Sequence, residues 1–185
     1  MPITPPHGCV LALIRLDAGT KLRVSGVERR CVPTDMDDID RHILRVLQRD
    51  GRTQNVDLAR IVGLSPSPCL RRVRRLEDTG VITRYTALLD GRKIGIALTV
   101  FARISLISQD AETVERFAVM VRELPQVVEC HVMAGECDAL LRVVAADLDG
   151  YRHFQSTYLT RANGVQTVKT DIPMQRVKLS TELPI

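Results

Sequence analysis

The chain has 185 residues, of which 45% are hydrophobic and 26% charged, a balance typical of a folded globular protein that excludes a disordered one. Only 3% of the residues are aromatic and none is tryptophan, so little material is available for stacking on single-stranded bases. The net charge of +4 is unevenly distributed, since residues 35–95 carry +3 and residues 96–185 carry −2. A basic region followed by a slightly acidic one indicates two tasks in two places.

The five cysteines show no Cys-x-x-Cys spacing, and we interpret them as reduced thiols of a cytoplasmic protein rather than as a disulfide framework. No metal and no cofactor are expected, because the nearest candidates, Cys130, His131 and Cys137, match no common zinc spacing. The apolar run Cys9–Ile14 is too short to span a bilayer, and no lysine or arginine precedes it as a signal peptide would require.

Residues 1–35 contain four prolines and no sustained hydrophobic period, so we expect a poorly ordered extension. Periodic sequence begins directly after Met36. This raises the hypothesis that translation naturally starts at that methionine.

Helical spacing of apolar residues predicts a first helix that follows an N-cap at Asp37 or Asp38 and ends at Gly51. Asp40 is expected to face outward together with the arginines of the same helix. A second short helix is expected at about Asn55–Val62, with its aliphatic residues facing inward.

A turn at Gly63 leads into Ser65-Pro66-Ser67-Pro68, where a serine before a proline is a typical helix start. The third helix should continue to Asp78. Two helices joined by a turn that contains glycine form a helix-turn-helix. Since the β-rich segment Val81–Thr86 follows as a wing strand, residues 36–90 are predicted to form a winged helix-turn-helix domain.

Residues 91–97 are polar and contain glycine, as expected of a hinge, and residues 98–185 then alternate strands with helices. The predicted elements are a strand at Leu98–Leu106, a helix at Ala111–Leu124, strands at Val127–Ala134 and Ala139–Ala145, a helix after Asp147 that bears Leu148 on its apolar face, and a strand at Val165–Ile172, with a further strand at Gln175–Leu179 left open. The order β-α-β-β-α-β is that of a ferredoxin-like fold. The whole chain is therefore predicted to be an α+β protein.

Four arginines of the third helix carry the strongest functional signal. The residues expected to face the core are Cys69, Leu70, Val73 and Leu76, which forces Arg71, Arg72, Arg74 and Arg75 outward. Guanidinium groups this close repel one another unless a polyanion neutralises them, and arginine matches both phosphate and the guanine edge. The sequence therefore predicts binding of double-stranded DNA.

The predicted DNA-binding residues are Ser65, Ser67, Pro68, Arg71, Arg72 and Arg75. Of these, Ser67, Pro68 and Arg71 are expected to face the bases, whereas the other two arginines face phosphates. Main-chain N–H groups at the start of the helix are expected to hold a further phosphate. The structural alternative is a solvated arginine face paired with Glu77 and Asp78.

No catalytic constellation is found in the sequence. It contains no Gly-x-Ser-x-Gly, no His-Glu-x-x-His and no glycine-rich phosphate loop. The acidic cluster at Asp37, Asp38 and Asp40 is typical of a helix start rather than of a pair of catalytic carboxylates. We therefore do not expect an enzyme.

At this point the chain resembles the Lrp/AsnC family of leucine-responsive and feast/famine regulators. The segments that carry the resemblance are Asp37–Leu44, Asn55–Ala59, Gly63–Glu77, Gly80–Ile82, Tyr85–Leu89, Glu129–His131 and Gly135–Leu141. It covers about residues 36–180, and residues 1–35 have no counterpart.

The resemblance implies a homodimer built by the C-terminal sheets, often assembled further into octamers, that binds a pseudo-palindromic operator. It also implies a small effector, commonly an amino acid, between C-terminal domains. The effector positions are Gly135, Glu136, Asp138, Leu148, Asp171 and Ile172. Turn N–H groups can hold a carboxylate and Asp138 an ammonium group, although a plain hairpin turn would also place glycine and aspartate there. Ala139 and Asp171 depart from the family pattern, so the effector could differ from leucine or be absent.

We favour a sequence-specific regulator of transcription, and two other functions stay open. An architectural, weakly selective DNA wrapper would need the same residues. A sirohaem-decarboxylase-like enzyme of this architecture would need basic and histidine residues in its C-terminal cleft, where the sequence offers only His131 and His153 as histidines.

Overall fold

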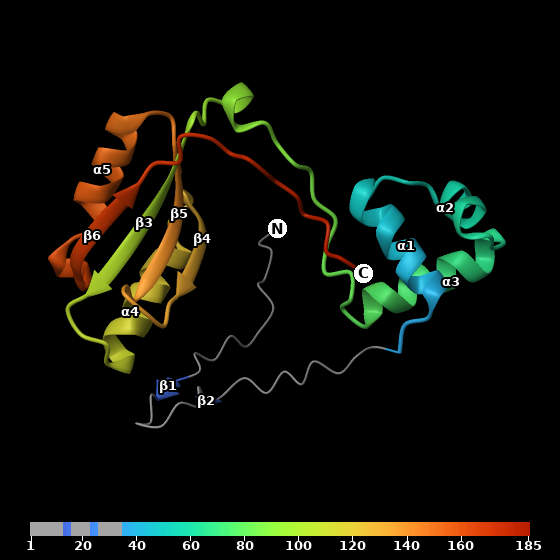
Figure 1. Ribbon diagram of the computed structural model, residues 1–185, viewed down its shortest axis with the longest axis horizontal. Coiled ribbons are helices and arrows are strands. Elements are labelled where there is room, and N and C mark those ends of the chain that lie inside the picture. Colours follow the sequence, from blue (N-terminus) through green and yellow to red (C-terminus); the bar gives the residue numbers. More distant parts are fainter. Residues whose placement is uncertain (1–12, 16–22, 26–34) are drawn as a thin grey trace. The chain divides into compact units, whose positions relative to one another are not determined.

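The computed structural model describes residues 13–15, 23–25 and 35–185, which divide into two compact units (Figure 1). The helical unit comprises residues 35–88 together with 177–185, and the sheet unit comprises residues 89–176 with the two short N-terminal segments. Each unit has its own cluster of buried apolar side chains. Each therefore has the core that a separately folded domain requires.

The helical unit contains α1 (Asp38–Arg49), α2 (Asn55–Val62) and α3 (Pro66–Asp78), whose bounds agree with the predicted helices. Its core consists of Ile43, Leu44, Leu58, Ala59, Val62, Cys69 and Leu76. The predicted helix-turn-helix is confirmed, with α2 and α3 as its two helices.

Local capping chemistry fixes where these helices begin and turn. The Asp37 carboxylate accepts a hydrogen bond from the Asp40 amide at 2.9 Å, and the Asp40 side chain accepts one from the Asp37 amide at 3.3 Å. After α2, Gly63 has a left-handed φ of +74°, which a residue with a Cβ adopts only at a cost. Asn55 Nδ2 donates to the Pro66 carbonyl at 2.8 Å and so ties the start of α2 to the start of α3.

The predicted wing strand at Val81–Thr86 is not formed, because the segment has no strand to pair with in the described part of the chain. Side chains hold it to the helices instead. The Tyr85 hydroxyl donates to Glu77 Oε1 at 2.9 Å, and Val81 and Ile82 pack against the core.

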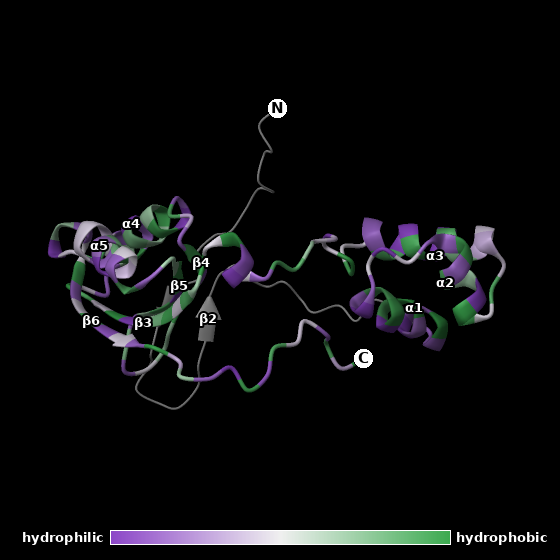
Figure 2. Ribbon diagram, turned by 90° about the horizontal axis from the view of Figure 1, so that it is seen from above, coloured by the Kyte–Doolittle hydropathy of each residue, from purple (hydrophilic) through white to green (hydrophobic). Residues whose placement is uncertain are grey.

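The sheet unit has the predicted order of strands and helices. Its elements are β3 (Leu98–Leu106), α4 (Ala111–Arg122), β4 (Val127–Val132), β5 (Ala139–Ala145), α5 (Leu148–Tyr158) and β6 (Val165–Asp171). The antiparallel sheet runs β4-β5-β3-β6, and both helices cover one of its faces (Figure 2). The ferredoxin-like fold and the α+β class are therefore confirmed.

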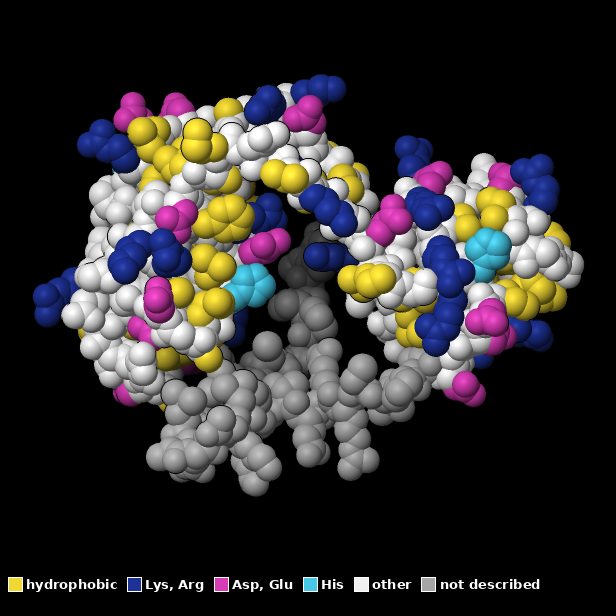
Figure 3. All heavy atoms as spheres, viewed as in Figure 1, with side chains coloured by type: hydrophobic (Ala, Val, Ile, Leu, Met, Phe, Trp, Pro, Cys, Tyr) yellow, Lys and Arg dark blue, Asp and Glu magenta, His cyan; other side chains and the backbone are white. Residues whose placement is uncertain are grey.

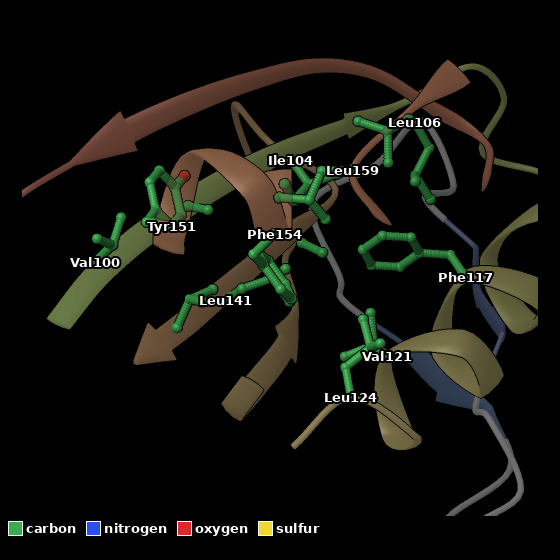
Figure 4. Close-up of a cluster of buried hydrophobic side chains, with 14 residues drawn as sticks. Val100, Ile104, Leu106, Phe117, Val121, Leu124, Leu141, Tyr151, Phe154 and Leu159 are labelled. Atoms are coloured by element: carbon green, nitrogen blue, oxygen red, sulfur yellow. The ribbon is translucent and has the colours of Figure 1, made fainter. Parts of the chain in front are cut away.

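The core of the sheet unit lies between the sheet and these two helices (Figure 4). Alternate residues of β3, from Val100 to Leu106, are buried while those between them are partly exposed, as the period of a strand requires. Phe117 of α4 and Phe154 of α5 pack on this buried row, and the Tyr151 hydroxyl hydrogen-bonds Thr170 Oγ1 at 2.8 Å.

Some bounds differ from the prediction. α4 ends at Arg122 and β4 at Val132, each two residues earlier than expected. No strand forms at Gln175–Leu179, because residues 177–185 belong to the helical unit rather than to the sheet.

Of the predicted N-terminal extension, residues 1–35, the structure describes β1 (Leu13–Arg15), β2 (Arg23–Ser25) and Asp35, and the two strands pair antiparallel. The sequence did not indicate this pairing. The rest of that prediction lies outside the described residues, and the start at Met36 stays a prediction. Among the helices that the structure describes, none has the length and apolar content needed to cross a membrane.

Candidate DNA interface and ligand site

The outer face of α3 carries a shallow depression with a mixed lining. It is lined by Ser67, Leu70, Arg71, Arg74, Arg75 and Asp78. The sequence pattern placed Leu70 toward the core, but its side chain is 37% exposed because it opens onto this face. Guanidinium, hydroxyl and apolar groups together suit the mixed edge of a base pair, which offers acceptors and the thymine methyl group.

Two arginines of α3 are held by carboxylates at the start of α1. Arg72 Nη1 donates to Asp37 Oδ2 at 2.8 Å and to Asp40 Oδ1 at 2.9 Å, and Arg75 Nη2 donates to the other Asp40 oxygen. The Asp40 side chain is fully buried, whereas those of Arg72 and Arg75 are 27% and 47% exposed. We call these four residues the Asp40 clamp. The clamp joins α1 to α3 through one buried carboxylate that two guanidinium groups share.

The prediction that Asp40 faces outward is wrong, since its side chain has no exposed surface. It lies three residues before Ile43 and four before Leu44, so helical spacing places it on the buried face of α1. A buried carboxylate is tolerated only when it is paired and hydrogen-bonded, and the clamp supplies both conditions. The helical period of α1 therefore predicts that Asp40 is buried, whereas its charge suggested that it is exposed.

Hydrogen bonds from the Asp40 amide and the Arg72 guanidinium lower the pKa of Asp37 below its ordinary value. The carboxylates of Asp40 and Asp37 raise the pKa of Arg72 in return. Two arginines thus face two carboxylates, and this group adds little net charge to the surface of α3.

Arg71 and Arg74 are exposed, and neither forms an ion pair with a carboxylate in the described part of the chain. They lie three residues apart, which places them on neighbouring positions of one helix face. The sequence prediction of DNA-binding residues included Arg71 but not Arg74, because four arginines in one helix cannot be ranked without their partners. Figure 3 shows how arginine and lysine side chains spread over this unit beside acidic ones.

The start of α3 offers fewer main-chain donors than the sequence suggested. Ser65 is the N-cap but makes no side-chain capping bond, and Pro66 and Pro68 have no N–H group. The Cys69 amide donates to the Ser65 carbonyl at 3.2 Å, so the amide of the exposed Ser67 is the one main-chain donor left in the first turn. Phosphate binding at this helix end therefore depends more on hydroxyl and guanidinium groups than on the backbone.

In the sheet unit, the turn between β4 and β5 contains three predicted effector residues, Gly135, Glu136 and Asp138. Asp138 Oδ2 accepts a hydrogen bond from the Leu106 amide at 2.7 Å, and Oδ1 accepts one from Gln109 Nε2 at 2.7 Å. One carboxylate oxygen thus holds the end of β3, and the other holds the loop that follows it. Glu136 is exposed and forms no ion pair with another described residue.

The other three predicted effector residues belong to other elements of the unit, namely the start of α5 and the end of β6. The turn precedes β5 and Leu148 follows it, so a whole strand separates them. Asp171 ends β6, where its Oδ1 accepts a hydrogen bond from Arg103 Nη2 at 3.1 Å, and Ile172 comes next. Leu148 is thus set apart from the turn, whereas Asp171 and, less strongly, Glu136 both raise the pKa of Arg103, so these two carboxylates flank one guanidinium group.

A helix-turn-helix with free arginines, followed by a ferredoxin-like unit with its own core, defines a two-domain DNA-binding regulator. Comparison with protein-family models agrees. Residues 36–83 match the winged helix-turn-helix DNA-binding model, and residues 99–183 match the Lrp/AsnC ligand binding domain.

Related proteins extend this match. The chain is 44% identical over 151 residues to the leucine-responsive regulatory proteins of Salmonella typhimurium and Escherichia coli, covering 82% of this chain and 92% of theirs. A Neisseria meningitidis transcriptional regulator solved in complex with L-Met has a TM-score of 0.77 and 39% identity, covering 80% of this chain and 96% of that one. An AsnC family regulator from Agrobacterium tumefaciens has a TM-score of 0.74 and 41% identity, covering 80% and 97%.

The chain belongs to the Lrp/AsnC family. It is a DNA-binding transcriptional regulator of that type with a separate ligand-binding domain.

Proposed function

We propose that this regulator recognises specific duplex sequences with the outer face of α3, through Ser67, Arg71 and Arg74. The observation that carries the proposal is that Arg71 and Arg74 are exposed and free of carboxylates, while the Asp40 clamp fixes the helix that bears them. Recognition helices of this motif place their N-terminal residues at base edges in the major groove. Ser65 and Pro68 stand beside Ser67 at that end, and the exposed edges of Arg72 and Arg75 reach phosphates.

We infer further that the chain acts as a homodimer and in higher assemblies such as octamers. Both described helices of the sheet unit, α4 and α5, lie on one face of the sheet, and a second copy would cover the other face (Figure 2). A two-fold symmetric dimer would read a pseudo-palindrome whose half-sites lie roughly 10 bp or a multiple apart.

The ligand, we propose, is an amino acid bound between copies of the sheet unit. Relatives are named leucine-responsive, and one neighbour was solved with L-Met. The six predicted effector residues come from the turn before β5, the start of α5 and the end of β6, and we place the pocket where these elements meet a second copy. Since both oxygens of Asp138 are already engaged, Glu136 is the carboxylate better placed to meet an α-ammonium group. No catalytic step is part of this proposal.

The DNA interface is tested with a duplex selected from a random pool by the wild-type protein. The double variant Arg71→Ala with Arg74→Ala should lower the affinity for this duplex roughly 10- to 100-fold and reduce the preference for it over a scrambled duplex, because arginines at base edges carry sequence discrimination. The control, Arg152→Ala with Arg161→Ala, removes the same charge from the sheet unit and should leave affinity and preference unchanged. Unchanged affinity and preference in the α3 variant would refute the interface. Equal affinity for a scrambled duplex would instead identify an architectural DNA wrapper.

The ligand is tested by thermal unfolding against each of the twenty amino acids. A bound amino acid should raise the melting temperature, since saturation at 100 times the Kd is worth about 2.7 kcal/mol. Glu136→Gln should reduce this shift, whereas Glu112→Gln on α4 should not. If no amino acid stabilises the protein at millimolar concentration, the effector proposal is wrong while the DNA interface stands.

A further inference from the structure

The last nine residues of the chain, Val177–Ile185, belong to the helical unit although they follow the sheet unit in sequence. Strand β6 ends at Asp171. The C-terminal end of the chain lies beside the helices in Figure 1. No helix or strand is assigned to this segment. Its position must therefore come from contacts with the helices rather than from secondary structure of its own.

Three side chains of α1 hold the main chain and side chain of this segment. Gln48 Nε2 donates to the Leu183 carbonyl at 3.3 Å, and Gln48 Oε1 accepts from the Leu183 amide at 2.6 Å. Arg45 Nε donates to the Ile185 carbonyl at 2.7 Å. Arg49 Nε and Glu182 Oε2 form an ion pair at 3.4 Å. One carboxamide thus satisfies both main-chain groups of a residue, as a neighbouring strand would.

The three α1 residues lie at positions i, i+3 and i+4 and so share one face of the helix. The Asp40 clamp uses another part of α1, near its start. Ile185 is partly buried and packs against the core of the helical unit, whereas the Leu183 side chain is 70% exposed. Ile185 is therefore the apolar anchor, and Leu183 is held through its backbone alone.

We propose that residues 177–185 act as an intramolecular peptide ligand of the DNA-binding unit: they dock on the Arg45, Gln48 and Arg49 face of α1 of the same chain and stabilise that unit. The partner that this face fits is an extended segment with free main-chain groups, an acidic side chain for Arg49 and an aliphatic anchor. The unit that binds DNA is thereby completed by a segment whose contacts with α1 span 133 to 140 residues in sequence.

The test compares two identical substitutions in the full chain, Ile185→Asp and Leu183→Asp, by hydrogen exchange. Ile185→Asp should speed exchange of the α1 amides at least about fivefold, because it removes the anchor, and leave the amides of α4 and α5 unchanged. Leu183→Asp places the same charge on an exposed side chain and should leave α1 within about twofold of the wild type. If the two variants exchange alike in α1, docking by the apolar anchor is refuted.

A photo-crosslinking residue at position 183 then asks which copy is bound. Irradiation of the full chain with benzoylphenylalanine at this position should give a monomer-sized product whose crosslinked peptide contains Gln48. A dimer-sized product joined to α1 of another copy would overturn docking within one chain. A product without any α1 peptide would overturn the docking site itself.

Discussion

The two units solve the problem of a stable core in different ways. Among its described residues, the sheet unit buries fourteen apolar side chains between a four-stranded sheet and two helices, and the buried polar one is the uncharged Thr113. The helical unit buries seven apolar residues and also Asp40, the one buried charged residue in the described part of the chain. A sheet is positioned by its ladders of hydrogen bonds, whereas three short helices have only side chains to fix their mutual orientation.

This difference bears directly on DNA binding. The buried carboxylate orients α3 but also neutralises Arg72 and Arg75, so the charge that positions the recognition helix is withdrawn from its DNA-facing surface. Breaking a buried ion pair is costly because the remaining charge loses its partner. Stability and DNA affinity should therefore respond in opposite directions when the clamp is changed, which is not expected anywhere in the sheet unit.

The largest loss of stability is expected for a substitution in the sheet unit. Phe154→Ala should lower the free energy of unfolding by about 3–5 kcal/mol, because Phe154 is 3% exposed and packs between Tyr151 and Tyr158. Hydrogen exchange should show the loss in β3 and α5 and spare α3. Val119→Ala on the exposed face of α4 serves as the control, with a loss below about 0.5 kcal/mol. Equal loss of protection in α3 would contradict the division into two separately stabilised units.

Asp40→Asn is expected to cause a smaller loss of stability and, at the same time, to increase the salt dependence of DNA binding. Removing the charge should destabilise the protein by about 2 kcal/mol, less than for a fully buried pair because both arginines can reach water. Freed guanidinium groups should steepen the salt dependence of binding to random DNA by about 1 to 2 in slope. Denaturation and DNA titration at several salt concentrations measure the two effects. Asp38→Asn, an exposed change in the same helix, should alter neither, and a shallower slope for Asp40→Asn would contradict the role assigned to the clamp.

A still smaller effect is expected at the turn of the helix-turn-helix. Gly63→Ala should cost about 1 kcal/mol, because an added Cβ meets nothing within 4 Å and the cost is that of the left-handed backbone alone. Gly63→Asn should cost less, since asparagine tolerates this conformation. Chemical denaturation ranks the two variants. Equal costs for alanine and asparagine would show that packing rather than backbone conformation decides this position.

The smallest effect on stability is expected for Tyr85, in the segment Val81–Thr86 that was predicted to form the wing strand. Burial, with the hydrogen bond to Glu77, raises the pKa of Tyr85 from 10.0 to about 12. The contribution of the protonated Tyr85 hydroxyl to folding stability is therefore fully present below pH 10 and is lost as the pH rises through about 12. Tyr85→Phe should cost about 0.5 kcal/mol at pH 7, because the side chain is half exposed. Since the chain lacks tryptophan, absorbance of tyrosinate follows the titration, and Tyr85→Phe should remove its last phase.

The sequence by itself determined most of the local structure. The bounds of α2, α3, β3 and β5 followed from the spacing of apolar residues and from glycine, proline and capping residues, because those signals act within a few positions along the chain. The outward direction of Arg71 followed in the same way. The period of α1 even indicated the buried face on which Asp40 lies.

Only the tertiary structure decided which charges are free. Arg72 and Arg75 contact Asp40 across 32 and 35 residues of sequence, and the segment 177–185 contacts α1 across more than 130. A local sequence pattern cannot predict contacts between residues so far apart in the chain. The wing failed to form for the same reason, since a strand depends on a partner elsewhere in the fold. Helical spacing predicts the direction in which a side chain points, but the packing of the helices decides which group it contacts.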